Sequence, residues 1–338
     1  MYALAVGIGT KNSKNEWLEV YFPRPVFKPE QSLVDSFAAV TGYDGGNRDI
    51  ELSGADIENL ADSLSDEAQK SLLTDLRGTQ RPVVLTLIDT DSALQSTPET
   101  YLKLHLLSHR FVLPNDQNLE GIYPLLPNVA WTENGAVDLS DLEALQIAER
   151  LKGRVLEVSA VDKFPKMTNY VVPDGVRIAH SARVRLGAYI GEGTTVMHEG
   201  FVNFNAGAVG PNMIEGRISQ GVTVDSGTDL GGSASTAGTL SGGGNIVITV
   251  GKDCLLSANA GTGIPLGDRC TIEAGLYITP GTVVQIIDEE RNAVKLVKAR
   301  ELAGQNDMLF IRNSQSGLVE CRTNRKAIEL NSALHSHN

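Results

Sequence analysis

The sequence predicts a parallel β-helix, preceded by an α/β domain and followed by a small C-terminal β-hairpin cap. Three observations support this fold class. Glycine is concentrated in the middle of the chain, where 22 of the 34 glycines lie between Val172 and Val284. In the same region branched or small apolar residues recur at every sixth position. Ordinary strand and helix patterns precede this region, and hairpin patterns follow it.

The six-residue period predicts a β-helix at residues 166–284. A helix would repeat apolar residues three and four apart, and a lone strand would alternate by two. Short strands joined by tight turns fit, because each hexad points one branched side chain inward and bends at Gly, Asn, Asp or Pro. Three hexads close a triangular coil, so residues 18 apart become neighbours. The predicted inward residues are Val172, Ile178, Val184, Ile190, Val196, Val202, Ala208 and Ile214, then, after a four-residue step, Ile218, Val224 and Leu230. After a break the pattern resumes at Val250 and Leu256, and after a second slip it continues at Leu266, Ile272, Ile278 and Val284.

Residues 1–165 carry the mixed pattern of an α/β domain. Ser53 is a predicted N-cap for one helix whose apolar stripe continues from Ile57 to Leu76. A linker is expected at residues 163–170. The other predicted elements are strands at residues 2–9, 17–22, 82–89 and 154–161, and helices at residues 98–109 and 142–151, the second capped by Ser140 or Asp141.

Residues 285–338 are predicted to form the C-terminal β cap and a tail. Two hairpin patterns turn near residues 290–292 and 315–317. They would cover the open end of the β-helix, whose last strands otherwise expose unpaired backbone groups. A short helix is expected at residues 326–334.

Charge and composition exclude several classes of function. The 29 basic and 41 acidic residues give a net charge of -12 and a pI near 5.0, which disfavours binding to nucleic acid or an anionic membrane. The longest apolar stretch, residues 82–88, is far shorter than the roughly 20 residues that cross a bilayer. The three cysteines, Cys254, Cys270 and Cys321, form no CxxC pair. We therefore expect a cytoplasmic protein.

Stacked coils would bring two sets of chemically active residues together. His180 and His198 would be neighbours, either beginning a metal site or lying as solvated imidazoles, since zinc needs three protein ligands. Glu199 and Arg217 are also 18 apart, and Glu215 lies two residues before the arginine. A carboxylate can deprotonate an amine or attack a thioester, and an arginine suits a substrate carboxylate. A surface ion pair without function is the alternative.

Two further features allow both a functional and a structural interpretation. The repeat breaks between Thr236 and Val250, where the segment 239–244 could close over a donor or could be a plain surface loop. Basic residues after the repeat could bind the phosphates of a nucleotide-containing donor or form a solvated face. These basic residues are Arg291, Lys295, Lys298, Arg300 and Arg312.

Long motifs in the repeat and after it resemble one family. The quoted stretches are MHEGFVNFNAGAVGPNMIEGRIS, DLGGSAS, GTLSGGG, CLLSANAGTGIPLGD, IEAGLYITPGT and KARELAGQNDMLFIRNSQSG. They resemble the tetrahydrodipicolinate N-succinyltransferases among the hexapeptide-repeat acyltransferases, most closely the branch with a long N-terminal domain. The resemblance covers roughly residues 165–320, and the part of the chain before it matches in layout only.

The resemblance implies a left-handed β-helix and a homotrimer whose active sites lie between subunits. It also implies transfer of succinyl from succinyl-CoA to the amine of opened tetrahydrodipicolinate, in the diaminopimelate route to lysine. By matching MIEGR, Glu215 is the catalytic carboxylate, as an acyl-anhydride nucleophile or a general base, and Arg217 binds the succinyl end of the donor. The same matching places along the donor groove Gly232, Ser235, Ala258, Glu273, Ala274, Gly281, Lys298, Ile311, Arg312, Asn313 and Ser314.

The resemblance also raises the question of a metal. Some members hold Mg²⁺ on the three-fold axis, using the glutamate of MHEG and an acidic residue one coil earlier. The glutamate here is Glu199, but the earlier position is Ala182. Any ion in this protein would rest on three symmetry copies of Glu199.

Three other functions are consistent with the residues considered without the resemblance. One is an acyl-CoA-dependent N-acyltransferase that acts on an amino sugar. Another is a non-catalytic β-helix that binds or assembles. The third is a metal-dependent lyase of the carbonic-anhydrase type.

Overall fold

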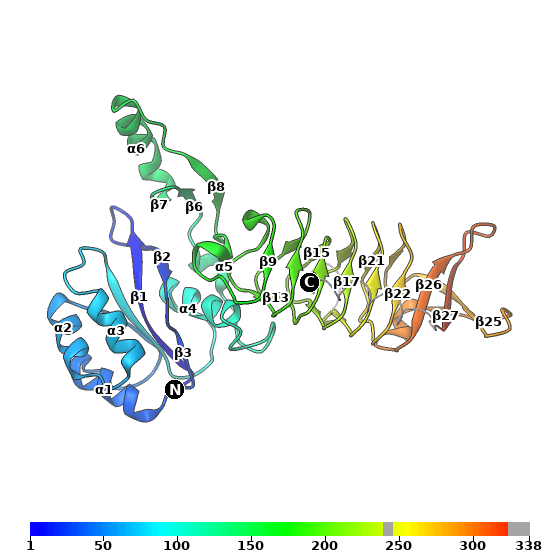
Figure 1. Cartoon of the computed structure of the whole chain (residues 1–338), viewed down its shortest axis with the longest axis horizontal. Helices are drawn as coiled ribbons and strands as arrows, with labels where there is room; N and C mark the ends of the chain where they lie inside the picture. Colours follow the sequence, from blue (N-terminus) through cyan, green and yellow to red (C-terminus); the bar gives the residue numbers. More distant parts are fainter. Residues whose placement is uncertain (239–245, 324–338) are drawn as a thin grey trace. The chain divides into compact units, whose positions relative to one another are not determined.

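The structure, a computed structural model, describes residues 1–238 and 246–323 (Figure 1). The chain forms two compact units. The first unit comprises residues 1–106, 117–165 and 169–171, and the second comprises residues 107–116, 166–168 and those from Val172 onward. Residues 107–116 thus pack with the β-helix, although they lie inside the predicted N-terminal domain. The domain boundaries at residues 165 and 284 remain a proposal.

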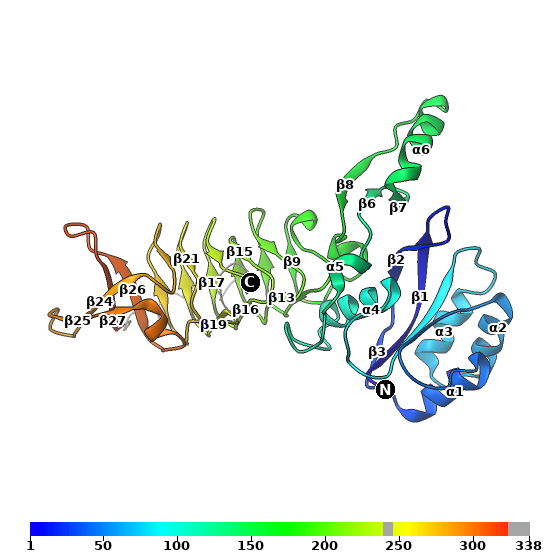
Figure 2. The same ribbon diagram turned by 180° about the vertical axis from the view of Figure 1, so that it is seen from behind.

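The first unit is built on a five-stranded sheet in the order β2-β1-β5-β4, with β3 also paired to β1. Strand β5 is buried along its whole length, as its uninterrupted run of branched residues predicts. Helices α1, α2 and α3 lie together on one side of this sheet (Figures 1 and 2). The strands are β1 (Ala3–Lys11), β2 (Trp17–Tyr21), β3 (Val26–Phe27), β4 (Arg48–Glu51) and β5 (Val83–Ile88).

The helix predicted from Ser53 to Leu76 is wrong in one respect, because two helices occupy this range. Helix α2 (Gly54–Ser63) begins at a capping box between Ser53 and Asp56. It ends at Leu64, which takes an extended conformation while its side chain stays in the core. The Asp66 carboxylate then accepts the Gln69 amide hydrogen bond and starts α3 (Glu67–Asp75). The apolar stripe continues from α2 into α3, so the break between the two helices can be recognised only from the N-cap of α3, Asp66.

The rest of the first unit contains predicted and unpredicted elements. Helix α4 (Thr97–Ser108) confirms the helix predicted at residues 98–109. Helix α6 (Leu139–Leu151) starts earlier than predicted, because Asp138 caps it in place of Ser140 or Asp141. Strand β8 (Val158–Asp162) is shorter and lies later than predicted. The unpredicted elements are β3, β4, α1 (Gln31–Thr41), α5 (Ile122–Leu125), β6 (Val129–Thr132) and β7 (Gly135–Asp138).

The predicted linker at residues 163–170 is divided between the two units. Phe164 and Met167 are buried, and Met167–Asn169 forms a 3₁₀ turn. Within the second unit, the Met167 amide donates to the Val184 carbonyl oxygen at 2.9 Å. Phe164 is thus buried in the first unit and Met167 in the second.

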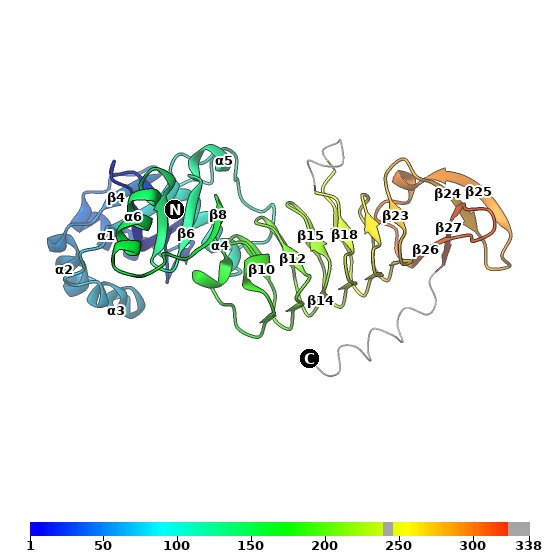
Figure 3. The same cartoon turned by 90° about the horizontal axis from the view of Figure 1, so that it is seen from above.

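The second unit is a parallel β-helix with three faces, whose coils stack side by side (Figure 3). The first face contains β9 (Arg177–Ile178), β11 (Thr195–Val196), β14 (Met213–Ile214), β17 (Asp229–Leu230), β20 (Leu255–Leu256) and β22 (Thr271–Ile272). The second face contains β12 (Phe201–Val202), β15 (Arg217–Ile218), β18 (Ser235–Thr236), β21 (Gly261–Thr262) and β23 (Tyr277–Ile278). The third face contains β10 (Ala188–Ile190), β13 (Ala206–Ala208), β16 (Thr223–Val224) and β19 (Thr249–Val250).

The predicted inward residues fill the interior of these coils, with one clear exception. Val172 is 69% exposed, because it precedes the first coil strand, β9. The first coils have the expected length of three hexads, as in the pair Val196 and Ile214. After Ile214 several coils are shorter, as in the pair Ile214 and Leu230. The four-residue step in the sequence thus marks a shortened corner.

A polar ladder formed by Asn212, Thr228, Cys254 and Cys270 runs through the interior beside the first face. Each of these residues immediately precedes a first-face strand, and each is buried. The Thr228 hydroxyl donates to the Gly251 carbonyl oxygen at 2.6 Å and accepts from the Cys254 amide at 2.8 Å. The Cys254 sulfur in turn accepts from the Cys270 amide at 3.2 Å. The ladder satisfies corner backbone groups that water cannot reach.

Two antiparallel hairpins complete the C-terminal end, as predicted (Figure 2). Strands β24 (Val283–Ile287) and β25 (Ala293–Lys298) flank the first predicted turn, and β26 (Met308–Arg312) and β27 (Val319–Thr323) flank the second. Strand β26 pairs in parallel with β22, so the hairpins cover the last first-face edge. The helix predicted at residues 326–334 lies outside the described residues. No helix in the described ranges is long and apolar enough to span a membrane.

The polar ladder can be tested with Thr228→Val, which keeps the side-chain shape and removes both hydrogen bonds. Each buried group left without a partner costs about 1–3 kcal/mol, so losing the partner of both the Gly251 oxygen and the Cys254 amide should lower the free energy of unfolding by about 2–6 kcal/mol. Thermal and denaturant unfolding at one protein concentration would measure this loss. The control is Thr223→Val, at a half-buried strand position where the hydroxyl bonds to none of the described residues. Equal stability of the two variants would contradict the role of the ladder.

Candidate active site

Glu215 lies in the corner that joins β14 on the first face to β15 on the second. This corner has only two residues, Glu215 and Gly216, whereas residues 197–200 and 231–234 form longer corners in the neighbouring coils. The Glu215 amide donates to the Leu230 carbonyl oxygen at 2.8 Å. A Cβ atom at Gly216 would lie 2.4 Å from the Ala234 carbonyl oxygen, so the tight corner requires glycine. The pair Glu215–Gly216 therefore forms the two-residue corner that shortens this coil.

The Glu215 carboxylate lies between the longer corners on either side. The residue is half-buried, and its side chain has no hydrogen-bond or ion-pair partner among the described residues. A Cβ atom at Gly232, in the next corner, would lie 3.7 Å from Glu215 Oε2. Gly232 thus adjoins the carboxylate and places no side chain beside it. A carboxylate with free lone pairs can accept a proton or attack an electrophilic carbonyl carbon.

Most of the predicted donor-groove residues follow Glu215 along the same corner of the β-helix. Gly232, Ala258 and Glu273 lie in three successive corners between the first and second faces. Backbone hydrogen bonds of 2.9 Å join these corners, from the Asn259 amide to the Gly232 oxygen and from the Gly275 amide to the Ala258 oxygen. Ala274 adjoins Glu273 in its corner.

Residues 311–314 continue this edge after the last coil. The Glu273 carboxylate accepts a hydrogen bond from the Arg312 amide at 2.7 Å. The Asn313 side chain is held within its own turn, because its amide group donates to Glu320 at 2.7 Å and its oxygen accepts from the Gln315 amide. Glu273 and Asn313 therefore shape the edge through internal bonds.

Gly281 and Lys298 lie at the opposite edge of the second face. Gly281 is in the turn after β23, and the Ala299 amide, next to Lys298, donates to the Thr282 oxygen at 2.8 Å. Arg217 and Ser235 lie on the second face between the two edges. The predicted basic cluster is divided, since strands β24 and β27 separate Lys298 on β25 from Arg312 on β26.

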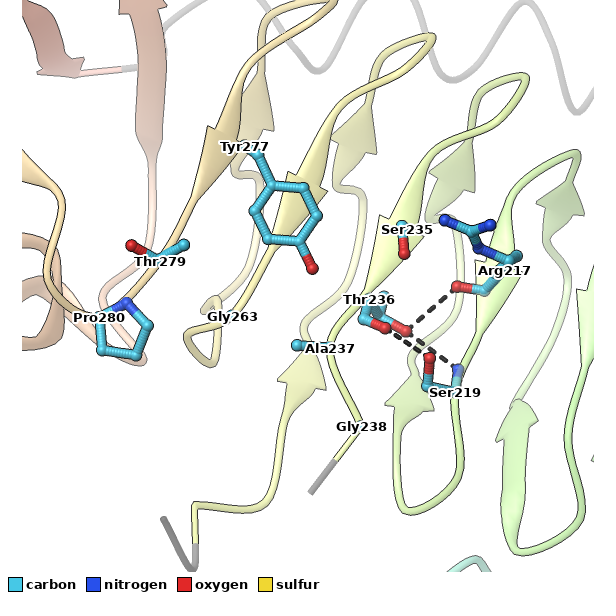
Figure 4. Close-up of a pocket in the computed structure, with 10 residues that line it drawn as sticks. All are labelled: Arg217, Ser219, Ser235, Thr236, Ala237, Gly238, Gly263, Tyr277, Thr279 and Pro280. Carbon is cyan, nitrogen blue, oxygen red and sulfur yellow. Dashed lines mark hydrogen bonds between the residues drawn. The ribbon is translucent and has the colours of Figure 1, made fainter. Parts of the chain in front are cut away.

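A pocket of about 440 Å³ lies on the second face (Figure 4). It contains Arg217 and Ser235 from the predicted set, and sequence reasoning missed the remaining lining residues. The strand register could have identified Tyr277 as a lining residue. Arg217, Ser235, Gly261 and Tyr277 occupy equivalent positions in successive strands. The missed lining residues are Ser219, Thr236, Ala237, Gly238, Gly263, Tyr277, Thr279 and Pro280.

The expected pairing of Glu199 with Arg217 is wrong. The shortened corner shifts the register, so that Arg217 pairs with Phe201 of the preceding coil. The Glu199 carboxylate lies 3.5 Å from the Arg183 guanidinium and 3.3 Å from His198 Nδ1. Arg217 is exposed, and its guanidinium has no partner among the described residues. The arginine is therefore available to a ligand.

The residues around Glu199 do not fit a metal site within one chain. The His180 and His198 rings are neighbours, as predicted, with centroids 5.3 Å apart. In the described part of the chain, however, no three histidine, cysteine or acidic residues are grouped to hold an ion. The register places Ser181 opposite Glu199, with Ala182 beside it, and neither carries a carboxylate. Glu199 instead faces the cation of Arg183.

The cysteines are unsuited to nucleophilic catalysis. All three are buried, and the hydrogen bond with Cys270 together with burial raises the pKa of Cys254 far above its ordinary value. Burial raises the pKa of Cys321 to about 12. Thiols with raised pKa values carry little of the reactive thiolate at neutral pH. The hydrogen bond with Cys254 lowers the pKa of Cys270, but the Cys270 side chain is fully buried and out of reach of a substrate. Glu215 is therefore the stronger candidate for the reacting group.

The chain matches two family models. The model described as "Tetrahydrodipicolinate N-succinyltransferase middle" matches residues 126–166, and the model described as "Hexapeptide repeat of succinyl-transferase" matches residues 247–280. The first match lies in the part of the chain where no motif indicated a family. Residues 126–166 contain strands β6 to β8 and helix α6.

Named relatives and a solved structure match nearly the whole chain. A 2,3,4,5-tetrahydropyridine-2,6-dicarboxylate N-succinyltransferase from Pseudomonas putida is 63% identical over 340 residues, covering 100% of this chain and 99% of the relative. A relative of the same name from Vibrio cholerae is 51% identical with the same coverage. A crystal structure from Campylobacter jejuni, described as a putative 2,3,4,5-tetrahydropyridine-2-carboxylate N-succinyltransferase, has a TM-score of 0.90 at 31% identity. It covers 97% of this chain and 93% of that chain.

These similarities confirm the resemblance read from the motifs. They also confirm the predicted fold class, a left-handed parallel β-helix with an N-terminal α/β domain and a C-terminal hairpin cap. The chain therefore belongs to the tetrahydrodipicolinate N-succinyltransferase family of hexapeptide-repeat acyltransferases.

Proposed function

We propose that the protein transfers the succinyl group of succinyl-CoA to the amine of opened tetrahydrodipicolinate, as a cytoplasmic enzyme of diaminopimelate and lysine biosynthesis. The observation that carries the proposal is the full-length identity of 51–63% with relatives named for this reaction. An amino-sugar acceptor, a purely binding role and a metal-dependent lyase lack comparable support.

The reaction needs a free amine, a placed thioester and a group that handles one proton. The amine nitrogen attacks the thioester carbonyl carbon, an amide bond forms, the carbon–sulfur bond breaks, and CoA leaves as the thiol after gaining a proton. The free lone pairs of Glu215 support its assignment as the reacting carboxylate. As a general base, Glu215 would remove the amine proton. As a nucleophile, it would first take the succinyl group as a mixed anhydride and then yield it to the amine.

The remaining predicted residues are assigned to donor binding. Arg217, without a partner among the described residues, is suited to the free carboxylate of the succinyl group. We assign the edge that contains Gly232, Ala258, Glu273 and Ala274 to the thioester and its pantetheine arm, because close backbone approach favours a narrow extended ligand. Ser235, Gly281, Lys298 and residues 311–314 are assigned to the same donor.

The proposed assembly is a homotrimer with active sites between subunits. The pocket on the second face is formed by one side of the β-helix, so the single chain leaves the opposite wall open to a partner. Within one chain, no second carboxylate lies beside Glu199 among the described residues, so an Mg²⁺ ion on the proposed trimer axis would be held by three copies of Glu199.

Removing the Glu215 carboxylate should abolish most of the activity without preventing donor binding. For Glu215→Ala and Glu215→Gln we expect kcat to fall about 10²–10⁴-fold, the usual contribution of a catalytic acid or base, with the Kd for CoA changing less than about three-fold. Thiol release and calorimetry would measure the two quantities. Glu192→Gln, at an exposed corner carboxylate, is the matched control. Activity near wild type in either Glu215 variant would remove Glu215 from the mechanism.

The two roles of Glu215 predict different behaviour when the acceptor is absent. If Glu215 takes the succinyl group, rapid mixing with succinyl-CoA should release about one CoA per active site in a burst. If Glu215 acts only as a base, CoA release should wait for the acceptor. Stopped-flow thiol detection with Glu215→Gln as a blank distinguishes these outcomes.

The proposed trimer predicts a mass in solution of three times the 36.2 kDa of one chain. Sedimentation at the concentration used for the activity assay would measure it. A fully active species with the mass of a single chain would contradict active sites between subunits.

A further inference from the structure

A column of equivalent residues crosses the pocket on the second face. Parallel register pairs Arg217 with Ser235, Ser235 with Gly261, and Gly261 with Tyr277. Their neighbours Ile218, Thr236, Thr262 and Ile278 are buried inside the coils, so alternation along each strand turns the column outward. Arg217 and Tyr277 are thus separated by three strand spacings, about 14 Å between Cα atoms.

The tyrosine ring does not point away from the face but lies over the glycine of the preceding coil. A Cβ atom at Gly261 would lie 2.3 Å from Tyr277 Cε2 and 2.4 Å from Cδ2, so any larger residue would displace the ring. Figure 4 shows the Tyr277 hydroxyl on the side of the ring that faces Ser235 and Arg217. The missing side chain at position 261 therefore lets the phenol reach back along the column.

The polar groups of this column are hydrogen-bond donors that have no partners among the residues the structure describes. The guanidinium of Arg217 and the hydroxyls of Ser235 and Tyr277 make no side-chain hydrogen bond to the described residues. The residues that line the pocket include no acid. Tyr277 is still 44% exposed, so its hydroxyl is accessible to a ligand. A guanidinium and two hydroxyls without an opposing anion are suited to a carboxylate.

We propose that Tyr277 determines donor specificity, by donating a hydrogen bond from its hydroxyl to the free carboxylate of the succinyl group that Arg217 holds. The pocket then selects acyl donors that end in a carboxylate over neutral acyl donors. This inference rests on the proposed function. It gives a role to a residue that lies within the motif IEAGLYITPGT but is not among the donor-groove residues assigned from the motifs. The pocket would recognise a carboxylate. The succinyl group of the donor is one source of a carboxylate, and the acceptor, which is a dicarboxylate, is the other.

The decisive variant is Tyr277→Phe, which keeps the ring over Gly261 and removes only the hydroxyl. Loss of one hydrogen bond to a charged group should weaken succinyl-CoA about 10- to 100-fold, both in kcat/KM and in Kd. The Kd of CoA itself, which lacks the carboxylate, should change less than about two-fold. The KM of the acceptor should also stay constant. Calorimetry with CoA and with succinyl-CoA, in the absence of acceptor, provides the binding data.

Two further variants separate a specificity role from a structural one. Gly261→Ala should displace the ring and reproduce the loss of preference for succinyl-CoA over CoA, although the hydroxyl is still present. Tyr189→Phe, which removes a tyrosine hydroxyl from the third face, should leave the preference unchanged. Equal melting temperatures and oligomeric mass would show that the tyrosine variants fold normally.

Three results would overturn the inference. An equal loss of affinity for CoA and succinyl-CoA in Tyr277→Phe would make the residue a general contact of the donor. An unchanged preference would show that the hydroxyl does not reach the carboxylate. A raised KM for the acceptor alone would assign the hydroxyl to the acceptor carboxylate. Failure of the proposed function is a separate result, because wild-type protein would then release no thiol from succinyl-CoA with acceptor present.

Discussion

The second unit depends on parallel hydrogen bonding between successive coils. Each strand is very short, so no strand of the coils is stable alone, and every coil needs its neighbours to pair its backbone groups. This pairing fixes the spacing of the coils, and the closely stacked coils are filled by the buried apolar side chain that each hexad points inward. The same spacing brings corner backbones so close together that Gly216 cannot be replaced without a clash. Packing and site geometry therefore have one common origin.

The position of the candidate reacting group follows from a departure from that regularity. Glu215 lies where a corner is shorter than its neighbours, and the shortening both shifts the register and leaves the carboxylate between longer corners. Other corners lie beside the interior polar ladder. There the buried Thr228 hydroxyl bonds to the Gly251 carbonyl oxygen, and the buried Cys254 sulfur accepts from the Cys270 amide. The short corner at Glu215 thus exposes a candidate reacting group, whereas the hydrogen bonds of Thr228 and Cys254 stabilise the corners beside the polar ladder.

The sequence predicted the repeat well and the flanking unit less well. The inward positions from Ile178 to Val284 could be read because a period of six survives only if one side chain per strand faces the core. The break between helices α2 and α3, at Leu64 and Asp66, could not be predicted, because the apolar stripe continues through it. The start of the second helix depends on a single capping carboxylate, that of Asp66. Strand β4 was missed because Ile50 is its single apolar residue. In the candidate site, Arg217 and Ser235 were found through motifs, whereas Tyr277 became visible only through the register.

The sequence by itself determined the coil architecture and the family, and it singled out Glu215 and Arg217 as candidates, because these depend on local spacing and on motifs that are contiguous in the chain. Only the tertiary structure decided which residues face one another across coils. Glu199 precedes Arg217 by three hexads yet lies against Arg183, since a shortened corner changes the register. Tyr277 reaches toward Ser235 because Gly261, its partner in the preceding coil, carries no side chain. Contacts of this kind depend on accumulated corner lengths, which no single motif contains.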